Sequence, residues 1–132
     1  MKTNYVLLPE GMEVDEVAHY FDEFFDLYEN DHEGTYYLDE LCQLAERQWH
    51  TYEIIDDKRK ERIEKFLLDT MDYTSFQKFE STFYIVLMLG LQKVYDVILD
   101  QRKNIVNPEI LERISLGVDQ CGLDISDPYV DA

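Results

Sequence analysis

Carboxylate side chains are the groups in this sequence whose number and spacing suggest a chemical role. Between residues 10 and 40 the chain contains twelve Asp and Glu residues and neither Lys nor Arg. Acids at this density repel one another, and that repulsion opposes a compact state. The chemistry such a segment offers is the binding of positive charge. We therefore interpret it as the part of the chain that meets a cationic partner.

Five of these acids share one side of the first predicted helix. At 100° per residue they fall within an arc of about 60°; they are Asp15, Asp22, Asp26, Glu29 and Glu33. The solvent-facing side of a helix usually mixes both signs of charge, and this arc has no cation. We interpret it as a docking face for a basic cleft, such as the phosphate-binding groove of a nuclease. The alternative is an ordinary solvated helix face.

Tyrosine is unusually frequent in this chain. There are ten Tyr residues, and Tyr is enriched at protein–protein interfaces. Two of them are adjacent at the start of the second predicted helix, where both cannot face the core. The predicted partner-binding residues are therefore Asp15, Asp22, Glu23, Asp26, Glu29, Asp31, Glu33, Tyr36 and Tyr37.

A basic run follows the acidic segment. Its members, which alternate with acids, are Lys58, Arg59, Lys60, Arg62 and Lys65. We expect them to pair within the fold or to form a solvated face. The net charge of −17 and the pI of about 4.3 argue against direct binding to nucleic acid or to an anionic membrane, because both require Lys and Arg to neutralise phosphate.

No pattern typical of a metal centre or an active site is present. His19 and Glu23 are four residues apart, but a four-helix di-iron site needs a Glu-x-x-His pair from each of two helices. Zinc requires a tighter Cys/His grouping, and the acidic segment lacks the spacing of an EF-hand loop. No serine has the glycine context of a nucleophile elbow. We predict no catalytic residue, no metal, no cofactor and no enzymatic activity; an enzyme with a carboxylate-based metal site is the third hypothesis.

The two cysteines, Cys42 and Cys121, lie among apolar residues at helical spacing and are predicted to be reduced and structural. A disulfide between them stays possible. Residues 1–11 lack the apolar core of a signal peptide. The longest apolar run, residues 83–91, is shorter than the roughly 20 residues that span a membrane. We therefore expect a cytoplasmic protein.

Apolar residues recur at helical spacing along most of the chain. They predict a first helix over residues 13–31 and a second that begins near Thr35 and extends to about Ile54. Residues 58–70 continue the pattern, either as a third helix or as an extension of the second. The only short stretch that could be a strand is residues 5–8.

The second half of the chain predicts one long helix over about 75–103, opened by a Thr74–Gln77 capping box. Its middle is apolar on every side, and Gly90 within it suggests close approach of a neighbouring helix. Asn107 and Pro108 predict the start of the last helix, and Gly122 its end. The fold prediction is a single all-α domain, a bundle of about five helices with a long central buried helix. Residues 1–11 are predicted to form an N-terminal arm, and residues 123–132 an acidic tail that is loose or draped on the surface.

Size, charge and helicity together favour an inhibitory binding protein that blocks a basic functional surface of a partner protein. Immunity proteins that neutralise toxin nucleases, and DNA-mimicking inhibitors, occupy this niche. The expected partner is a basic nuclease or nucleic-acid-binding protein. The alternative is an acidic helical scaffold or assembly protein, possibly homodimeric, whose charge serves solubility. The sequence leaves the oligomeric state open.

Overall fold

A computed structural model describes residues 3–29 and 36–129 of the chain. Over these residues it contains six α-helices, two short 3₁₀ helices and no strand, which confirms the all-α prediction. None of the described helices is long and apolar enough to cross a membrane. The elements are η1 (Tyr5–Leu7), α1 (Val14–Tyr28), α2 (Tyr36–Trp49), α3 (Asp57–Thr70), α4 (Phe76–Leu89), α5 (Gln92–Gln101), η2 (Arg102–Asn104) and α6 (Pro108–Cys121).

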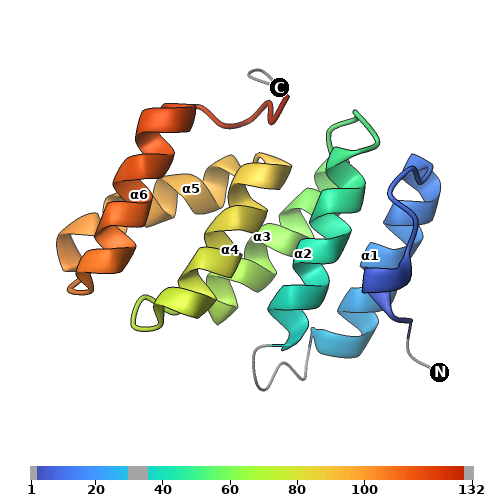
Figure 1. Ribbon diagram of the computed structural model, residues 1–132, viewed down its shortest axis with the longest axis horizontal. Helices are drawn as coiled ribbons and strands as arrows, with labels where there is room; N and C mark the ends of the chain where they lie inside the picture. Colours follow the sequence, from blue (N-terminus) through green and yellow to red (C-terminus); the bar gives the residue numbers. More distant parts are fainter. Residues whose placement is uncertain (1–2, 30–35, 130–132) are drawn as a thin grey trace.

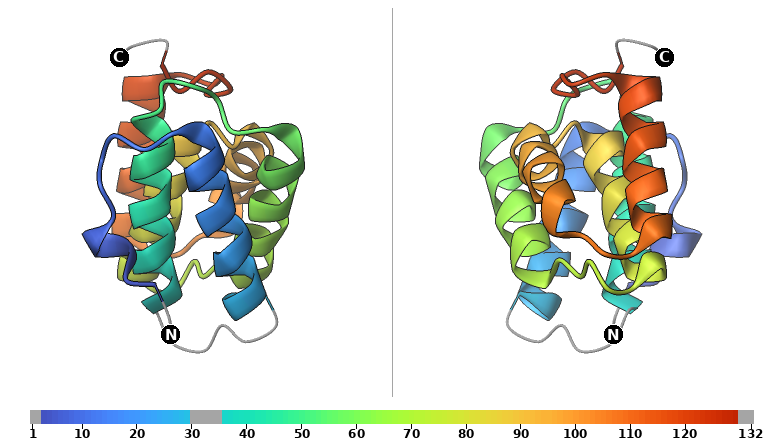
Figure 2. Two further views of the ribbon diagram at one scale, coloured as in Figure 1. Left: turned by 90° about the vertical axis from the view of Figure 1, so that its right-hand side faces the viewer. Right: turned by 90° about the vertical axis from the view of Figure 1, so that its left-hand side faces the viewer.

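The helices form two layers closed at one side by α1. In Figure 1, α2 lies between α1 and α4, and α4 lies between α2 and α6. Helices α3 and α5 lie behind this row, as the side views in Figure 2 show. The core between the layers is rich in aromatic rings; its largest fully buried members include Phe21, Phe24, Phe79, Phe83 and Tyr95.

Helix α1 is positioned by its apolar side. Val17, Phe21 and Phe24 recur at helical spacing and are completely buried. Glu13 and Glu16 form a capping box at its start, which satisfies backbone N–H groups that have no partner within the helix. The rows of acids on the remaining sides of α1 are therefore presented by a rigid, well-anchored element.

The predicted long central helix is wrong, because the chain breaks at Gly90. This residue has φ 67° and ψ 41°, the left-handed conformation that favours glycine at the end of a helix. It ends α4, and α5 begins two residues later. The expectation of close approach at Gly90 is correct in part. The neighbour is the C-terminal tail, not a helix, since a Cβ atom on Gly90 would lie 2.7 Å from the backbone oxygen of Ile125.

Other helix boundaries follow local capping chemistry. The second and third predicted helices are separate, and Asp56 caps α3 by accepting a hydrogen bond from the N–H of Arg59. Ser75, and not Thr74, caps α4, because the Thr74 hydroxyl bonds to Asp72 instead. The predicted start of α6 at Asn107–Pro108 and its end at Gly122 are confirmed. Thr35, the expected cap of α2, lies outside the described residues.

The N-terminal arm is held against α2. Residues 5–7 form the 3₁₀ helix η1 and not a strand. The buried Arg47 donates hydrogen bonds to the backbone oxygens of Val6 and Leu8, at 3.2 and 2.8 Å. The Tyr5 hydroxyl donates to Glu23 on α1 at 2.9 Å.

The sequence left the C-terminal tail loose or draped on the surface, and its described part packs against the bundle. The Tyr95 hydroxyl donates to the Gly122 oxygen at 2.6 Å. The Gln92 side chain donates to the Leu123 oxygen and accepts from the Ile125 N–H, at 2.9 and 2.7 Å. With the Ile125 side chain buried as well, the tail is fixed across one end of the bundle.

Both cysteines are free thiols and are partly buried. The Cys42 thiol donates to the backbone oxygen of Ser81 at 3.7 Å. Burial raises the pKa of this thiol to about 12. Cys42 is therefore protonated and unreactive at neutral pH.

Candidate partner-binding surface

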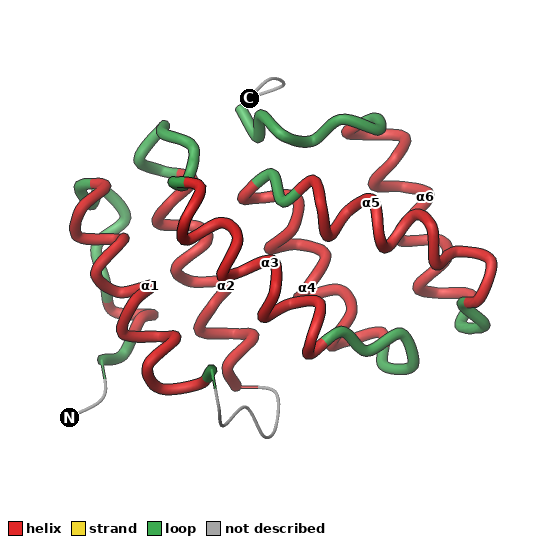
Figure 3. Tube along the Cα trace, turned by 180° about the vertical axis from the view of Figure 1, so that it is seen from behind, coloured by secondary structure: helices red, strands yellow, loops and turns green. Residues whose placement is uncertain are grey.

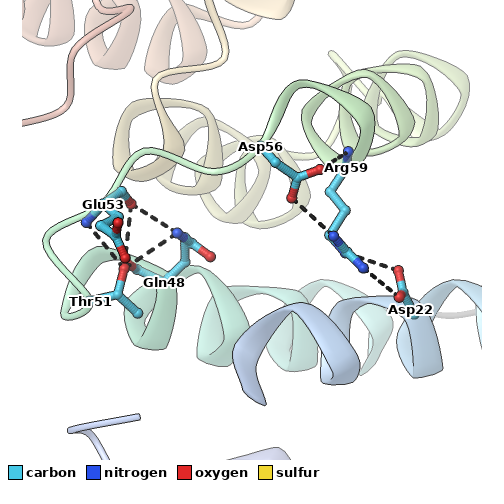
Figure 4. A network of polar contacts seen from close by, with 6 residues as sticks. All are labelled: Asp22, Gln48, Thr51, Glu53, Asp56 and Arg59. Carbon is cyan, nitrogen blue, oxygen red and sulfur yellow. Dashed lines mark hydrogen bonds and ion pairs between the residues drawn. The ribbon is translucent and has the colours of Figure 1, made fainter. Parts of the chain in front are cut away.

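The acids of α1 divide into a group that contacts α3 and a group that faces solvent. In the first group, Asp22 receives two hydrogen bonds from Arg59, at 3.1 Å to Oδ1 and 2.7 Å to Oδ2. Figure 4 shows this pair, with Asp56 on the other side of the guanidinium. Paired hydrogen bonds of this kind are the strongest contacts that a carboxylate makes with arginine.

A second arginine repeats the arrangement near the end of α1. Arg62 donates to Glu29 at 2.9 and 3.4 Å, and its guanidinium lies 4.6 Å from the centre of the Phe25 ring. Asp26 is 4.0 Å from the same guanidinium. The prediction that the basic run pairs within the fold is thus confirmed for Arg59 and Arg62. The acidic arc contains no cation of its own, but Arg59 and Arg62 of α3 lie against it.

These contacts keep the carboxylates ionised. The hydrogen bond from Arg59 lowers the pKa of Asp22, and the hydrogen bond from Arg62 lowers the pKa of Glu29. The same bonds raise the pKa of Arg59 and of Arg62. Asp22 and Glu29 therefore join α1 to α3, so a partner would have to compete with an arginine for each of them.

The remaining predicted binding residues have different environments. Glu23 accepts the hydrogen bond from Tyr5. Tyr37 is only 3% exposed and packs edge-on against Phe66, so its ring belongs to the core. Tyr36 is the first residue of α2. Asp31 and Glu33 lie outside the described residues.

The acids that face solvent gather at the first turns of α1. Glu13, Asp15 and Glu16 are exposed, and no described cation lies within ion-pair distance of them. Asp15 and Glu16, with His19 and Tyr20, line an open hollow of about 330 Å³. Farther along the helix, the Asp26 side chain is 80% exposed. This is the part of the predicted binding face that a partner can reach.

The start of α1 lies at the same end of the bundle as the loop between α2 and α3 and the C-terminal tail. Both the front view in Figure 1 and the rear view in Figure 3 place these three segments at one end. The loop adds the exposed acids Glu53 and Asp56, the start of α3 adds Asp57, and the tail adds Asp124 and Asp127. Surface acids from distant parts of the sequence therefore converge here.

Three aromatic rings meet at this end, and the sequence analysis did not single them out. Trp49 at the end of α2, Tyr52 in the loop and Tyr129 in the tail have ring centres 5.6 to 6.1 Å apart. Trp49 and Tyr52 fit the apolar spacing of a longer second helix, so the spacing gave no sign of the turn that follows Trp49 and contains Tyr52. The contact with Tyr129 links residues 80 positions apart, and no local pattern reveals it.

Hydrogen bonds fix the loop that carries these rings. The Tyr129 hydroxyl lies 2.8 Å from the backbone oxygen of Trp49, to which it donates, and 3.2 Å from that of Glu53. As Figure 4 shows, the buried Gln48 side chain donates to the Glu53 oxygen at 2.8 Å, and the Thr51 hydroxyl donates to the Gln48 oxygen at 2.6 Å. The last carbonyls of α2 accept from these side chains as well as from the backbone N–H groups of Thr51 and Tyr52.

The described residues contain no group of three or more His, Cys, Asp or Glu placed to hold a metal ion. Comparisons with family models, with curated proteins and with solved structures find no match to this chain. The candidate surface offers fixed negative charge beside exposed aromatic rings.

Proposed function

We propose that this protein is an acidic inhibitory binding protein that covers a basic functional surface of a partner protein. The partner fits the description of a nuclease or a nucleic-acid-binding protein, because such proteins carry a basic surface to neutralise phosphate. An immunity protein against a toxin nuclease and a DNA-mimicking inhibitor are two forms of this function.

The observation that carries the proposal is the exposure of the α1 acids that no described cation neutralises. Glu13, Asp15 and Glu16 lie on a capped helix, so a partner meets them in a fixed arrangement. Fixed charge of one sign steers an oppositely charged partner into contact and speeds association. The net charge of −17 adds long-range attraction for a basic protein.

The arginine pairs exclude Asp22 and Glu29 from the proposed contact surface. Asp22 and Glu29 already stabilise the contact with α3. The proposed surface therefore runs from the first turns of α1 to Asp26 on its outer side. Towards the end of the bundle it continues into the loop that carries Glu53.

A charge-reversal experiment with a matched control tests the proposal. The test variant combines Asp15→Lys with Asp26→Lys, and the control combines Asp100→Lys with Glu112→Lys on α5 and α6, which lie on the far side of the bundle (Figure 1). Both variants change the net charge equally. Circular dichroism melts establish that each variant is folded before binding is compared.

The wild-type protein is expected to capture a basic protein from cell extract at low salt and to inhibit its nuclease or nucleic-acid-binding activity. The α1 reversals should weaken this binding by about tenfold or more, mostly through slower association, and the control should have a much smaller effect. Equal effects of the two variants would mean that the acids act only through total charge. A captured protein that retains full activity would contradict inhibition.

A second candidate function, a self-associating scaffold, is favoured by one observation on the N-terminal arm. Val6 and Leu7 are adjacent and 62% and 77% exposed. Neighbouring exposed apolar side chains can seat a second copy of the chain. Analytical ultracentrifugation separates the candidates. A stable dimer that Leu7→Glu converts to a monomer would favour the scaffold, whereas a monomeric wild type would exclude it.

A further inference from the structure

The ring cluster, made of Trp49, Tyr52 and Tyr129, is a surface feature with no role in the core. Tyr52 is 73% exposed, and the other two rings are partly exposed. The rings are tilted against one another by 33 to 46°. They therefore present a small aromatic platform to solvent.

Tyr52 occupies this platform at a cost in backbone energy. Its φ of 59° is the left-handed conformation, and it is the one described residue other than glycine with positive φ. A side chain with a Cβ is strained there, and such strain concentrates at functional sites. The loop bonds from Gln48 and Thr51 hold the strained turn in place.

The surroundings of the platform are negative. Glu53 and Asp127 are exposed, and both lie beside Tyr129: the Asp127 carboxylate accepts from the Tyr129 N–H at 2.9 Å, and the Glu53 backbone oxygen lies 3.2 Å from the Tyr129 hydroxyl. The rings also stand at the C-terminal end of α2, the negative end of its helix dipole. Arg62 and Arg113 lie over the rings of Phe25 and Phe83. Neither of these arginines covers the ring cluster.

We propose that the ring cluster, with Glu53 and Asp127, binds arginine side chains of a basic protein partner. The proposal rests on the function proposed above and names the chemistry at its centre. A guanidinium stacks on aromatic faces and pairs with carboxylates in two-bond geometry, whereas the ammonium of lysine is a compact, strongly hydrated charge. Such a platform discriminates between two kinds of cation, and diffuse negative charge does not.

Two peptides of equal length and charge test this inference on the full chain, poly-arginine and poly-lysine. Calorimetric titration gives the two affinities. Trp49 is the single tryptophan of the chain, so its fluorescence reports whether the peptide reaches the cluster. The test variant is Tyr52→Ala, and the control is Val106→Ala, an exposed apolar side chain in the connection between η2 and α6.

The wild type and Val106→Ala should bind poly-arginine about twofold to fivefold more tightly than poly-lysine, which is the range expected for an exposed cation–π contact. Poly-arginine should also change the Trp49 emission. Tyr52→Ala should lose the preference but retain binding to both peptides, and thermal melts should show it folded.

Three results would overturn the inference. Equal affinities of the wild type for both peptides would leave charge-driven binding intact and remove the arginine site. A preference that survives in Tyr52→Ala, or that appears without any change in Trp49 emission, would place the site elsewhere. Failure of both peptides to bind would instead reject the proposed function itself, and the arginine site with it.

Discussion

Asp22 on α1 and Arg59 on α3 are joined by two hydrogen bonds, of 3.1 and 2.7 Å, across residues 37 positions apart. The pair ties the most acidic helix of the protein to its most basic one. Asp22 was predicted to contact a partner, and this pair gives it a structural role within the fold. The acids of α1 must therefore be tested in two groups, because some stabilise the fold and others are available to a partner.

Asp22→Asn is expected to lower the free energy of unfolding at pH 7 by about 0.5–1 kcal/mol, the range for a partly exposed ion pair. Because the folded-state pKa of Asp22 is lowered by Arg59, this contribution is present above the unfolded-state pKa of about 3.9 and is lost as the pH falls through the folded-state value. Urea denaturation of both proteins between pH 7 and pH 2 measures it. A stability difference that persists unchanged at the lowest pH would rule out the ion pair as its cause.

Reversal of Asp22 and Glu29 to Lys should destabilise the protein more than neutralisation does, since each new ammonium would face Arg59 or Arg62. Asp15→Lys, which faces no described arginine, is the control and should cost less than about 1 kcal/mol through the helix dipole. Denaturant midpoints measure the loss of stability in each variant. Equal losses for the reversals at Asp22 and Glu29 and for Asp15→Lys would contradict the prediction.

Gly90→Ala should destabilise the protein by about 2 kcal/mol or more. The substitution combines a left-handed backbone with a Cβ that meets the Ile125 oxygen at 2.7 Å. Gly11→Ala is the control, because a Cβ at Gly11 meets nothing within 4 Å, and its effect should stay below about 0.5 kcal/mol. Thermal melts compare the two. A Gly90→Ala variant as stable as the control would show that the tail does not pack against this turn.

Tyr52→Gly should be more stable than Tyr52→Ala by about 0.5–1 kcal/mol. Both substitutions remove the ring, but only glycine accepts φ 59° without strain. In a helix interior the order is the reverse, so the sign of the difference tests the backbone conformation directly. Chemical denaturation of the two variants gives that sign. A Tyr52→Ala variant more stable than Tyr52→Gly would mean that the backbone at residue 52 is not left-handed in solution.

Tyr129→Phe should cost about 1 kcal/mol, because the ring remains while the hydroxyl that donates to the Trp49 oxygen is lost. It should also make the tail more sensitive to limited proteolysis. Tyr20→Phe is the matched control, since no hydrogen bond of its hydroxyl is recorded within the described chain. Similar stability and cleavage rates in the two variants would argue against a capping role for Tyr129.

Local sequence signals predicted much of the fold. The apolar spacing of Val17, Phe21 and Phe24 identified the buried side of α1, and the Asn107–Pro108 pair identified the start of α6. Both depend on residues within a few positions of each other. The division at Gly90 was missed because the flanking apolar residues suit one long helix as well as two short ones.

The candidate surface was harder to predict, because its geometry depends on contacts between distant residues. The sequence indicated a strong negative charge, and it placed Asp15 and Asp26 on one helix. It gave no means of knowing that Arg59 would lie opposite Asp22 or that Tyr129 would meet Trp49. Such contacts depend on how the helices pack, and the spacing of residues within one helix does not determine that.

The bond between Tyr129 and the end of α2 also sets an order of events during synthesis. Trp49 and Tyr52 leave the ribosome long before Tyr129, which follows Trp49 by 80 residues. Helices α1 and α2 can associate on the nascent chain, but the ring cluster cannot be completed until the tail has emerged. The aromatic part of the surface therefore forms after the acids of α1 have emerged, and a chain that stops before Tyr129 displays those acids without it.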